Sequence, residues 1–339
     1  MFFIGAVVMT AGLAFGECCI KNGDTLAFLG DSITQFGQND QDGYVNLVIR
    51  GLEAEGIEVT PVKAGISGNK SNQMLERLDR DVLSKKPQWM TLSCGINDVW
   101  HQELPNHQGV LIEDYKKNIT AILDKCAAAG CEVIVLTTTI YERDDPAGGK
   151  NAKVVEYNDF LRKIAAERKL RLVDLNAAFW NAKQADRRLR LTRDGVHMQS
   201  SGNHLMAKTI LEGVGVPSGD FAKIEREAWA PVWVLCRFEL KDAADRKAFV
   251  KATNEIIGAV RHEAGCLEYS LVGDAETDWE RPERLGDKTL WMIERWASVT
   301  SLKSHLETPH MKKYGPKVAP FKASSTFNVL QPVTERQTK

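Results

Sequence analysis

The sequence predicts two domains, an α/β domain built on a parallel sheet and then a smaller α+β domain. The chain has 339 residues, about twice the length of a typical domain. Residues 25–211 alternate short apolar, β-branched runs with stretches of helical periodicity, the pattern of repeated βα units. Residues 232–330 instead follow the order β-α-β-β-α-β, which predicts an antiparallel sheet with helices on one face.

The first domain should contain five strands and five helices. The expected strands are residues 25–29, 58–63, 89–93, 132–138 and 171–174. The expected helices are residues 44–55, 72–85, 112–129, 152–168 and 200–211. This alternation favours a doubly wound three-layer sandwich, in which ligands bind outside the carboxyl ends of the strands. The loops after residues 29, 63 and 93 are therefore expected to converge.

The second domain is expected after a boundary rich in glycine. Residues 213–220 read GVGVPSGD, a composition typical of a loop. We therefore expect one domain over residues 17–217, a linker over 218–231 and a second domain over 232–333. Its expected strands are residues 232–240, 266–273, 289–296 and 324–330, and its expected helices are residues 245–261 and 299–306.

The first sixteen residues, MFFIGAVVMTAGLAFG, contain no charged side chain. A membrane-spanning helix needs about 20 apolar residues, so this run is short for a span. Small residues precede the polar Glu17, as a signal peptidase requires, but no Lys or Arg precedes the apolar run. We interpret residues 1–16 as a signal peptide, which predicts a secreted or periplasmic protein. An uncleaved anchor and a structural segment are the alternatives.

The net charge and the cysteine content of the chain exclude several classes of protein. The 44 Lys and Arg residues nearly balance 45 Asp and Glu residues, which leaves a net charge of −1. Such a chain has no field that would attract a nucleic-acid backbone or an anionic bilayer. Seven cysteines in 339 residues are too few for a disulfide scaffold, and none has a metal-ligand partner at a useful spacing. We therefore expect no nucleic-acid partner, and no membrane insertion after signal removal.

Four short motifs carry polar groups to the predicted ligand-binding edge. They read GDS at residues 30–32, GISGN at 65–69, GIND at 95–98 and DGVH at 194–197. The first three each follow a predicted strand, and the fourth precedes the last helix of the domain. A GDS tripeptide alone is common, and Ser32 by itself would be interpreted as a helix N-cap. The ordered set of four is far more specific.

This ordered set resembles the SGNH hydrolase family, also called GDSL esterases, over residues 24–212. The four residues that name the family match Ser32, Gly68, Asn97 and His197. The resemblance implies a flavodoxin-like α/β/α domain and a serine ester hydrolase that needs no cofactor. His197 would take the proton of the Ser32 hydroxyl, and Asp194 would orient the imidazole. The backbone N–H groups of Ser32 and Gly68 and the amide of Asn97 would form the oxyanion hole.

Five neighbouring residues are candidates for substrate binding. They are Asp31, Asn69, Asp98, Trp100 and His101. For the three Asx residues, bracing of the loops is the favoured alternative, because such side chains commonly bond to the backbone of turns. Trp100 could stack on a sugar, and packing within an exposed loop is its alternative.

The substrate class is inferred from a variant of the first motif. The block reads GDSIT over residues 30–34 instead of GDSL, a variant frequent in family members that remove acetyl groups from carbohydrates. No long apolar stretch lies near the motifs, which argues against long-chain lipids. We therefore expect an exported esterase that removes short, acetyl-type groups from a glycan through an acyl-serine intermediate. A lysophospholipase or thioesterase with the same catalytic residues is the alternative.

A second set of motifs lies in residues 232–333. The stretches read HEAGCLEY at 262–269, ERW at 294–296, SLKSH at 301–305 and TPH at 308–310. This set resembles an antibiotic biosynthesis monooxygenase (ABM) domain, a ferredoxin-like module that usually forms a dimeric α+β barrel, although Ala264 replaces a proline common in the family. A homodimer is expected, since the uncovered face of a small sheet needs a partner. Some members oxidise aromatic substrates without metal or flavin, so a cofactor-independent monooxygenase is an alternative main activity.

The resemblance implies a pocket in this domain lined by aromatic and histidine side chains. The candidates are Tyr269, Trp291, Trp296, His305 and His310. Trp291 and Trp296 are five residues apart in a predicted strand and should point to opposite faces. His305 and His310 are also five apart, which is not a same-face helical spacing, and no carboxylate or cysteine lies at a convincing separation. We therefore expect no metal site.

Overall fold

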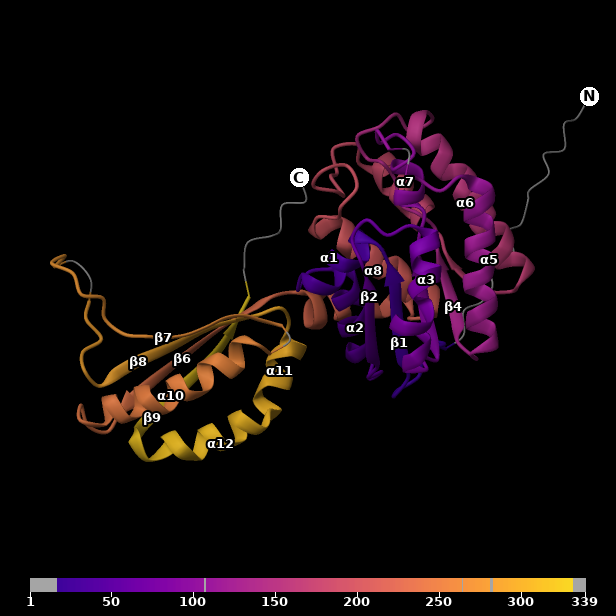
Figure 1. Cartoon of the computed structure of the whole chain (residues 1–339). Helices are drawn as coiled ribbons and strands as arrows, with labels where there is room; N and C mark the ends of the chain where they lie inside the picture. The colour runs from indigo at the N-terminus through magenta and orange to yellow at the C-terminus, as the bar shows by residue number, and fades with distance from the viewer. Residues whose placement is uncertain (1–16, 107, 264, 281–282, 332–339) are drawn as a thin grey trace, which may run out of the picture.

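The structure is a computed structural model that describes residues 17–106, 108–263, 265–280 and 283–331. The predicted signal peptide, residues 1–16, lies outside the described residues. Two sheets with separate hydrophobic cores divide the described chain into an N-terminal and a C-terminal domain (Figure 1). Within these ranges, no helix combines the length and the apolar character needed to cross a membrane.

The N-terminal domain is built on a parallel sheet of five strands in the order β2-β1-β3-β4-β5. The strands are β1 (Thr25–Gly30), β2 (Thr60–Gly65), β3 (Trp89–Ser93), β4 (Glu132–Leu136) and β5 (Arg171–Val173). The helices are α1 (Ser32–Asn39), α2 (Tyr44–Ala54), α3 (Ser71–Asp81), α4 (Ile96–Trp100), α5 (Ile112–Ala128), α6 (Gly149–Glu167), α7 (Leu175–Ala185) and α8 (Ser200–Val214), with a 3-10 turn at Leu83–Lys85. The predicted α/β class is confirmed.

Helices cover both faces of this sheet. On one face α2 packs against α8 and α8 against α7, and on the other α3 packs against α5 and α5 against α6. The direction in which successive strands are added to the sheet reverses between β1 and β3. Because the crossover connections are right-handed, this reversal places helices on both faces. The loops that leave the carboxyl ends of these two strands run to opposite faces. The reversal therefore leaves room for a ligand at this edge of the sheet.

The C-terminal domain is an antiparallel sheet of four strands in the order β7-β8-β6-β9. The strands are β6 (Val232–Leu240), β7 (Cys266–Val272), β8 (Thr289–Trp296) and β9 (Lys322–Leu330). The helices α10 (Asp245–Arg261), α11 (Val299–Glu307) and α12 (Pro309–Val318), with a 3-10 turn at Ala319–Phe321, gather on one side of the sheet in Figure 1. The α+β class is confirmed.

Residues 218–231, expected as a linker, are helical and pack on the N-terminal domain. They form a 3-10 turn (Ser218–Asp220), α9 (Phe221–Ile224) and a π-helical turn (Glu225–Trp229). Four of their side chains are buried in the N-terminal core, and the Trp229 indole N–H donates to the carbonyl of Leu47 at 2.9 Å. The glycine-rich composition that predicted a loop ends at Gly219, just before this apolar stretch.

The seven cysteines are all free thiols. Four of them are buried, and Cys18, Cys19 and Cys266 are half-buried. Burial raises the pKa of Cys19 and Cys266 to about 11, so both thiols stay protonated near neutral pH. The fold of the described residues therefore rests on its two apolar cores.

Candidate active site

Ser32 lies at the turn where the central strand of the parallel sheet enters a helix. β1 ends at Gly30 and α1 begins at Ser32, which is 6% exposed. The carboxylate of Asp31 caps the helix by accepting a hydrogen bond from the backbone N–H of Ile33 (2.9 Å). Asp31 is 2% exposed, so it braces the turn rather than presenting its carboxylate to solvent.

Ser32, His197 and Asp194 form a continuous hydrogen-bonded chain. The Ser32 Oγ lies 2.9 Å from Nε2 of His197, and Nδ1 of His197 lies 2.6 Å from Oδ2 of Asp194. The second oxygen of Asp194 accepts from the backbone N–H groups of Val196 (3.0 Å) and His197 (2.8 Å). An Nδ1–H donated to Asp194 leaves Nε2 free to accept the serine proton, which is the tautomer that a general base requires.

The environment of Asp194 keeps its carboxylate ionised. Partial burial opposes ionisation, but the hydrogen bonds from the His197 ring and from the backbone N–H groups of His197 and Val196 outweigh it. Together they lower the pKa of the Asp194 carboxyl to about 2. The carboxylate is therefore charged throughout the neutral range.

A half-buried glutamate, Glu142, which the sequence-based candidates did not include, anchors the loop before Asp194. Glu142 accepts hydrogen bonds from the backbone N–H groups of Leu191 (3.0 Å) and Thr192 (2.8 Å), and it pairs with Lys183 at 3.1 Å. The Thr192 hydroxyl in turn accepts from the backbone N–H of Gly195 at 3.1 Å. Glu142 belongs to no recognisable motif, and its partner Leu191 lies 49 positions away, so no local pattern predicts this role.

The two remaining motifs contain Gly68 and Asn97. The second motif bonds to the nucleophile turn, because the backbone N–H of Ile66 donates to the carbonyl of Gly30 at 3.1 Å. Gly68 has φ +77°, a left-handed conformation that disfavours other residues, and nothing lies within 4 Å of a Cβ built on it. Asn97, on α4, is 3% exposed, and its Nδ2 donates to the carbonyl of Asn69 at 3.1 Å. One N–H of the Asn97 amide therefore remains for a ligand.

Side chains of α1 and α3 hold the second motif against the nucleophile turn. Gln35 accepts from the backbone N–H of Ser67 (2.8 Å), and Gln38 accepts from that of Gly65 (3.0 Å). Arg77 donates to the Asn69 side chain (2.6 Å) and to the carbonyl of Gly30 (2.9 Å). These three long polar residues were absent from the sequence-based candidates. Gln35 and Gln38 lie on α1, which was not predicted, and Arg77 lies on a predicted helix but belongs to no motif.

Asn69 and Asp98 therefore occupy bracing positions. Asp98 is fully buried and accepts from both the backbone N–H (3.0 Å) and the hydroxyl (2.5 Å) of Ser71. Burial raises the pKa of Asp98 to about 6 and that of Asp31 to about 7. These contacts favour the loop-bracing alternative for both Asx positions over direct substrate contact.

Aromatic rings and an arginine line the rim of the site. Phe36 packs edge-on against the His197 ring (5.1 Å between centroids), and the Arg193 guanidinium lies over Phe36 at 4.5 Å. Trp100, half-buried, packs edge-on against Tyr141 at 6.4 Å. His101 is half-buried beside it, and burial lowers the pKa of its ring. Phe36 and Arg193 are rim residues that the sequence-based candidates did not include.

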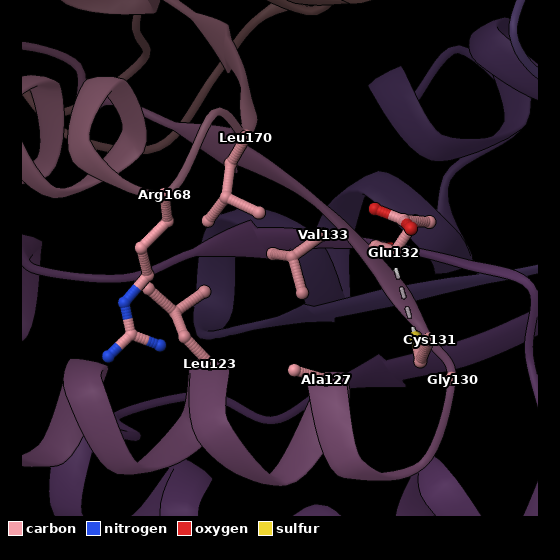
Figure 2. Close-up of a pocket in the computed structure, with 8 residues that line it drawn as sticks. All are labelled: Leu123, Ala127, Gly130, Cys131, Glu132, Val133, Arg168 and Leu170. Atoms are coloured by element: carbon pink, nitrogen blue, oxygen red, sulfur yellow. Dashed lines mark hydrogen bonds between the residues drawn. The ribbon is translucent and has the colours of Figure 1, made fainter.

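A separate pocket lies at the other end of the parallel strands, where β4 begins. Figure 2 shows its lining residues, among them Leu123 and Ala127 of α5, Val133 of β4 and Leu170, which directly precedes β5. The triad instead lies where β1 ends and α1 begins. This pocket therefore has no part in the arrangement around Ser32.

The C-terminal candidates separate into two groups. Tyr269, Trp296 and His305 are buried together, with the His305 ring 4.5 Å from that of Trp296 and 5.5 Å from that of Tyr269. Trp291 is half-buried on the other face of β8, as its five-residue spacing from Trp296 predicts. His310 joins the first group, although it lies in the next helix.

The expectation that no carboxylate accompanies the two histidines is wrong. Glu263 lies 3.0 Å from Nδ1 of His305 and 2.6 Å from Nε2 of His310. The histidines meet because Thr308 ends α11 and caps α12, so their spacing on a single helix does not apply. Glu263 is 42 positions before His305 and reaches it only through the fold.

Comparison with known proteins identifies both domains. Residues 28–205 match the model of the GDSL-like lipase/acylhydrolase family, and residues 231–317 match that of antibiotic biosynthesis monooxygenase. The chain is 30% identical to an acetylxylan esterase of Geobacillus stearothermophilus, over 58% of this chain and 96% of that protein. It is 32% identical to the probable quinol monooxygenase YgiN of Escherichia coli, over 26% of this chain and 83% of that protein.

Solved structures agree with these relationships. The G. stearothermophilus acetylxylan esterase superposes with a TM-score of 0.53 at 27% identity, covering 58% of this chain and 97% of that one. Catalytic mutants of that enzyme replace a Ser, an Asp or a His, and its Asp and His are three residues apart, the spacing of Asp194 and His197. The chain is a serine carboxylic ester hydrolase of the GDSL-like lipase/acylhydrolase family, joined to a C-terminal domain of the antibiotic biosynthesis monooxygenase family.

Proposed function

We propose that this esterase removes short acyl groups, acetyl above all, from a carbohydrate through an acyl-Ser32 intermediate. The main support is the hydrogen-bonded chain from Ser32 through His197 to Asp194, with contacts of 2.9 and 2.6 Å. The acetylxylan esterase relative supports the acetyl group and the carbohydrate. We also propose that the chain is exported, because residues 1–16 carry the composition of a signal peptide.

In the acylation half-reaction, the Ser32 oxygen attacks the ester carbonyl carbon while Nε2 of His197 takes the hydroxyl proton. Asp194 accepts the Nδ1–H at 2.6 Å and stabilises the imidazolium that forms. Collapse of the tetrahedral intermediate breaks the bond to the alcohol oxygen, which leaves with the proton from Nε2. A water molecule then repeats the sequence on the acyl-serine, releasing the carboxylic acid and restoring the Ser32 hydroxyl.

The tetrahedral oxyanion would be stabilised by three N–H donors. They come from the backbones of Ser32 and Gly68 and from the amide of Asn97. The Asn97 amide is held in place through its bond to the Asn69 carbonyl, so no reorganisation is needed when charge develops. A single donor of this kind contributes about 3 kcal/mol to transition-state stabilisation.

A series of 4-nitrophenyl esters tests the acyl preference. We expect purified residues 17–339 to hydrolyse the acetate with a higher kcat/KM than the butyrate, and the octanoate most slowly. Release of acetate from acetylated xylan, compared with a deacetylated sample, then tests the carbohydrate. A preference for octanoate would overturn the acetyl assignment and favour the lysophospholipase or thioesterase alternative.

We further propose that the C-terminal domain forms a homodimer. Among the strands of the described residues, β9 pairs with β6 alone and forms the edge of the sheet. Its apolar residues Phe327, Val329 and Leu330 are 48%, 44% and 44% exposed. Trp233 on the adjoining strand is 37% exposed. An unpaired edge strand with exposed apolar side chains is unfavourable in water, and a second copy would cover it.

Sedimentation equilibrium tests this dimer. We expect the wild-type chain to have twice the monomer mass, and Phe327→Asp to shift it toward monomer, because a buried interface would not accept the charge. Leu306→Asp is the matched control, since Leu306 is 43% exposed on α11, away from the strand edge. A monomeric wild-type chain at 50 µM would contradict the proposal.

A further inference from the structure

We propose that Glu263, His305 and His310 form a binding site for a divalent cation of the borderline class, such as Zn²⁺. The three residues come from separate elements of the C-terminal domain. Glu263 follows α10, His305 lies in the last turn of α11, and His310 lies in the first turn of α12. One ligand atom from each residue lies within 4.8 Å of the other two.

The distances suit a metal centre with little rearrangement. Two donors bound to zinc at about 2.0–2.1 Å in tetrahedral geometry are about 3.3 Å apart. Here a Glu263 oxygen lies 3.0 Å from His305 Nδ1 and 2.6 Å from His310 Nε2. To admit an ion, the Glu263 oxygen would need to move away from the nitrogens of His305 and His310 by about 0.3 and about 0.7 Å, respectively. Two imidazoles and a carboxylate are ligands that zinc and its neighbours in the first transition row accept.

The surrounding structure fixes both histidines. The His305 side chain is fully buried, with the Trp296 ring 4.5 Å away on one side. The Thr308 hydroxyl donates to the carbonyl of His305 at 2.8 Å, while its oxygen receives the backbone N–H of Met311, so it holds the two helix ends together. A site that is rigid before binding loses little entropy when the metal arrives.

The charge balance favours a cation. Glu294, 5% exposed, lies close enough to Glu263 for the two carboxylates to repel each other, and Trp296 is its hydrogen-bond partner. Within the described ranges, Glu263 forms ion pairs with the two histidines alone and with no Lys or Arg. A divalent ion bound to Glu263 would compensate this negative charge.

The proposed site keeps an open position. Three protein ligands leave the fourth tetrahedral position for water or another ligand, which is the arrangement of catalytic rather than structural zinc sites. The side chain of His310 is 29% exposed, whereas that of His305 is fully buried. Solvent therefore reaches the site from the His310 side, and an ion can enter without unfolding of the domain.

Isothermal titration of residues 17–339 with zinc sulfate tests the proposal. We expect one Zn²⁺ per chain with a micromolar or tighter Kd, and at least about a tenfold weaker Kd in His310→Ala and in Glu263→Gln, since each removes a direct ligand. Co²⁺ should give the intense visible absorption of a tetrahedral ion in the wild type, and this band should be lost in both variants.

Two controls separate this site from other histidines. His262→Ala removes an exposed imidazole next to Glu263 that contacts the carbonyl of Gly258, and it should bind zinc like the wild type. His197→Ala removes the histidine of the hydrolase site and should also leave zinc binding unchanged. Absence of zinc binding at 100 µM, or binding that persists in both ligand variants, would overturn the proposal. Circular dichroism confirms that each variant is folded.

Discussion

Replacement of Ser32 by alanine should lower kcat/KM for 4-nitrophenyl acetate by at least about 10³-fold. The hydroxyl lies 2.9 Å from Nε2 of His197, which is the base that would take its proton during attack on the ester. Without it, hydrolysis relies on water attack assisted by the remaining donors, which retains a small part of the rate. Initial rates under pseudo-first-order conditions measure the loss.

Ser84→Ala is the matched control for this variant. Ser84 is exposed, and its hydroxyl donates to the carbonyl of Arg80 at 2.8 Å, at the far end of α3. We expect its kcat/KM to equal that of the wild type. If Ser32→Ala hydrolysed acetate as fast as Ser84→Ala, the nucleophile would have to lie elsewhere, and the whole proposed mechanism would fail.

Replacement of Asp194 by asparagine should lower kcat on the order of 10³-fold, with little change in KM. The Asn amide can donate to Nδ1 of His197, which would place the ring proton on Nε2 and leave it unable to accept from Ser32. The wild-type carboxyl has its pKa lowered to about 2, so it stays ionised as the pH falls to about 4. The carboxylate therefore does not titrate in the neutral range, and initial rates at one neutral pH measure the loss.

A second Asp–His pair supplies the control for Asp194→Asn. Asp42 lies 2.8 Å from Nε2 of His204 on α8, in an Asp–His contact that does not include Ser32. Asp42→Asn should leave kcat within about twofold of the wild type. Equal activity losses in the two variants would mean that Asp194 contributes to stability rather than to orientation of His197, and thermal unfolding would show it.

Much of the hydrolase site was predictable because its residues follow strands. Ser32 and Gly68 each come directly after a short apolar run, and parallel strands bring such positions to one edge. The helices α1, α4 and α7 were not predicted. α1 and α4 are 8 and 5 residues long, too short for apolar periodicity to stand out, whereas α7 has 11 residues. Glu142 and Arg77 were missed for another reason. Their partners lie 49 and 47 positions away, and no local pattern encodes such a contact.

The C-terminal domain shows where spacing arguments fail. β6, α10 and β8 begin and end where alternation and helical periodicity predict. α12 was missed because it contains Pro309 and Pro316, which normally argue against a helix, although Pro309 occupies the tolerated first turn. The five-residue spacing of His305 and His310 was analysed as if on one helix. The break at Thr308 makes that spacing irrelevant and brings both rings to Glu263.

The helical segment at residues 218–231 determines where the chain can be divided into two fragments that each fold. A gene fragment that stops at residue 217 would remove Phe221, Ile224 and Trp229 from the core they complete, and would expose the α2 surface that Trp229 covers. A C-terminal fragment that starts at residue 218 would expose the same apolar side chains to solvent and would aggregate. We therefore propose residue 230 as the last residue of a stand-alone hydrolase and residue 231 as the first of its companion.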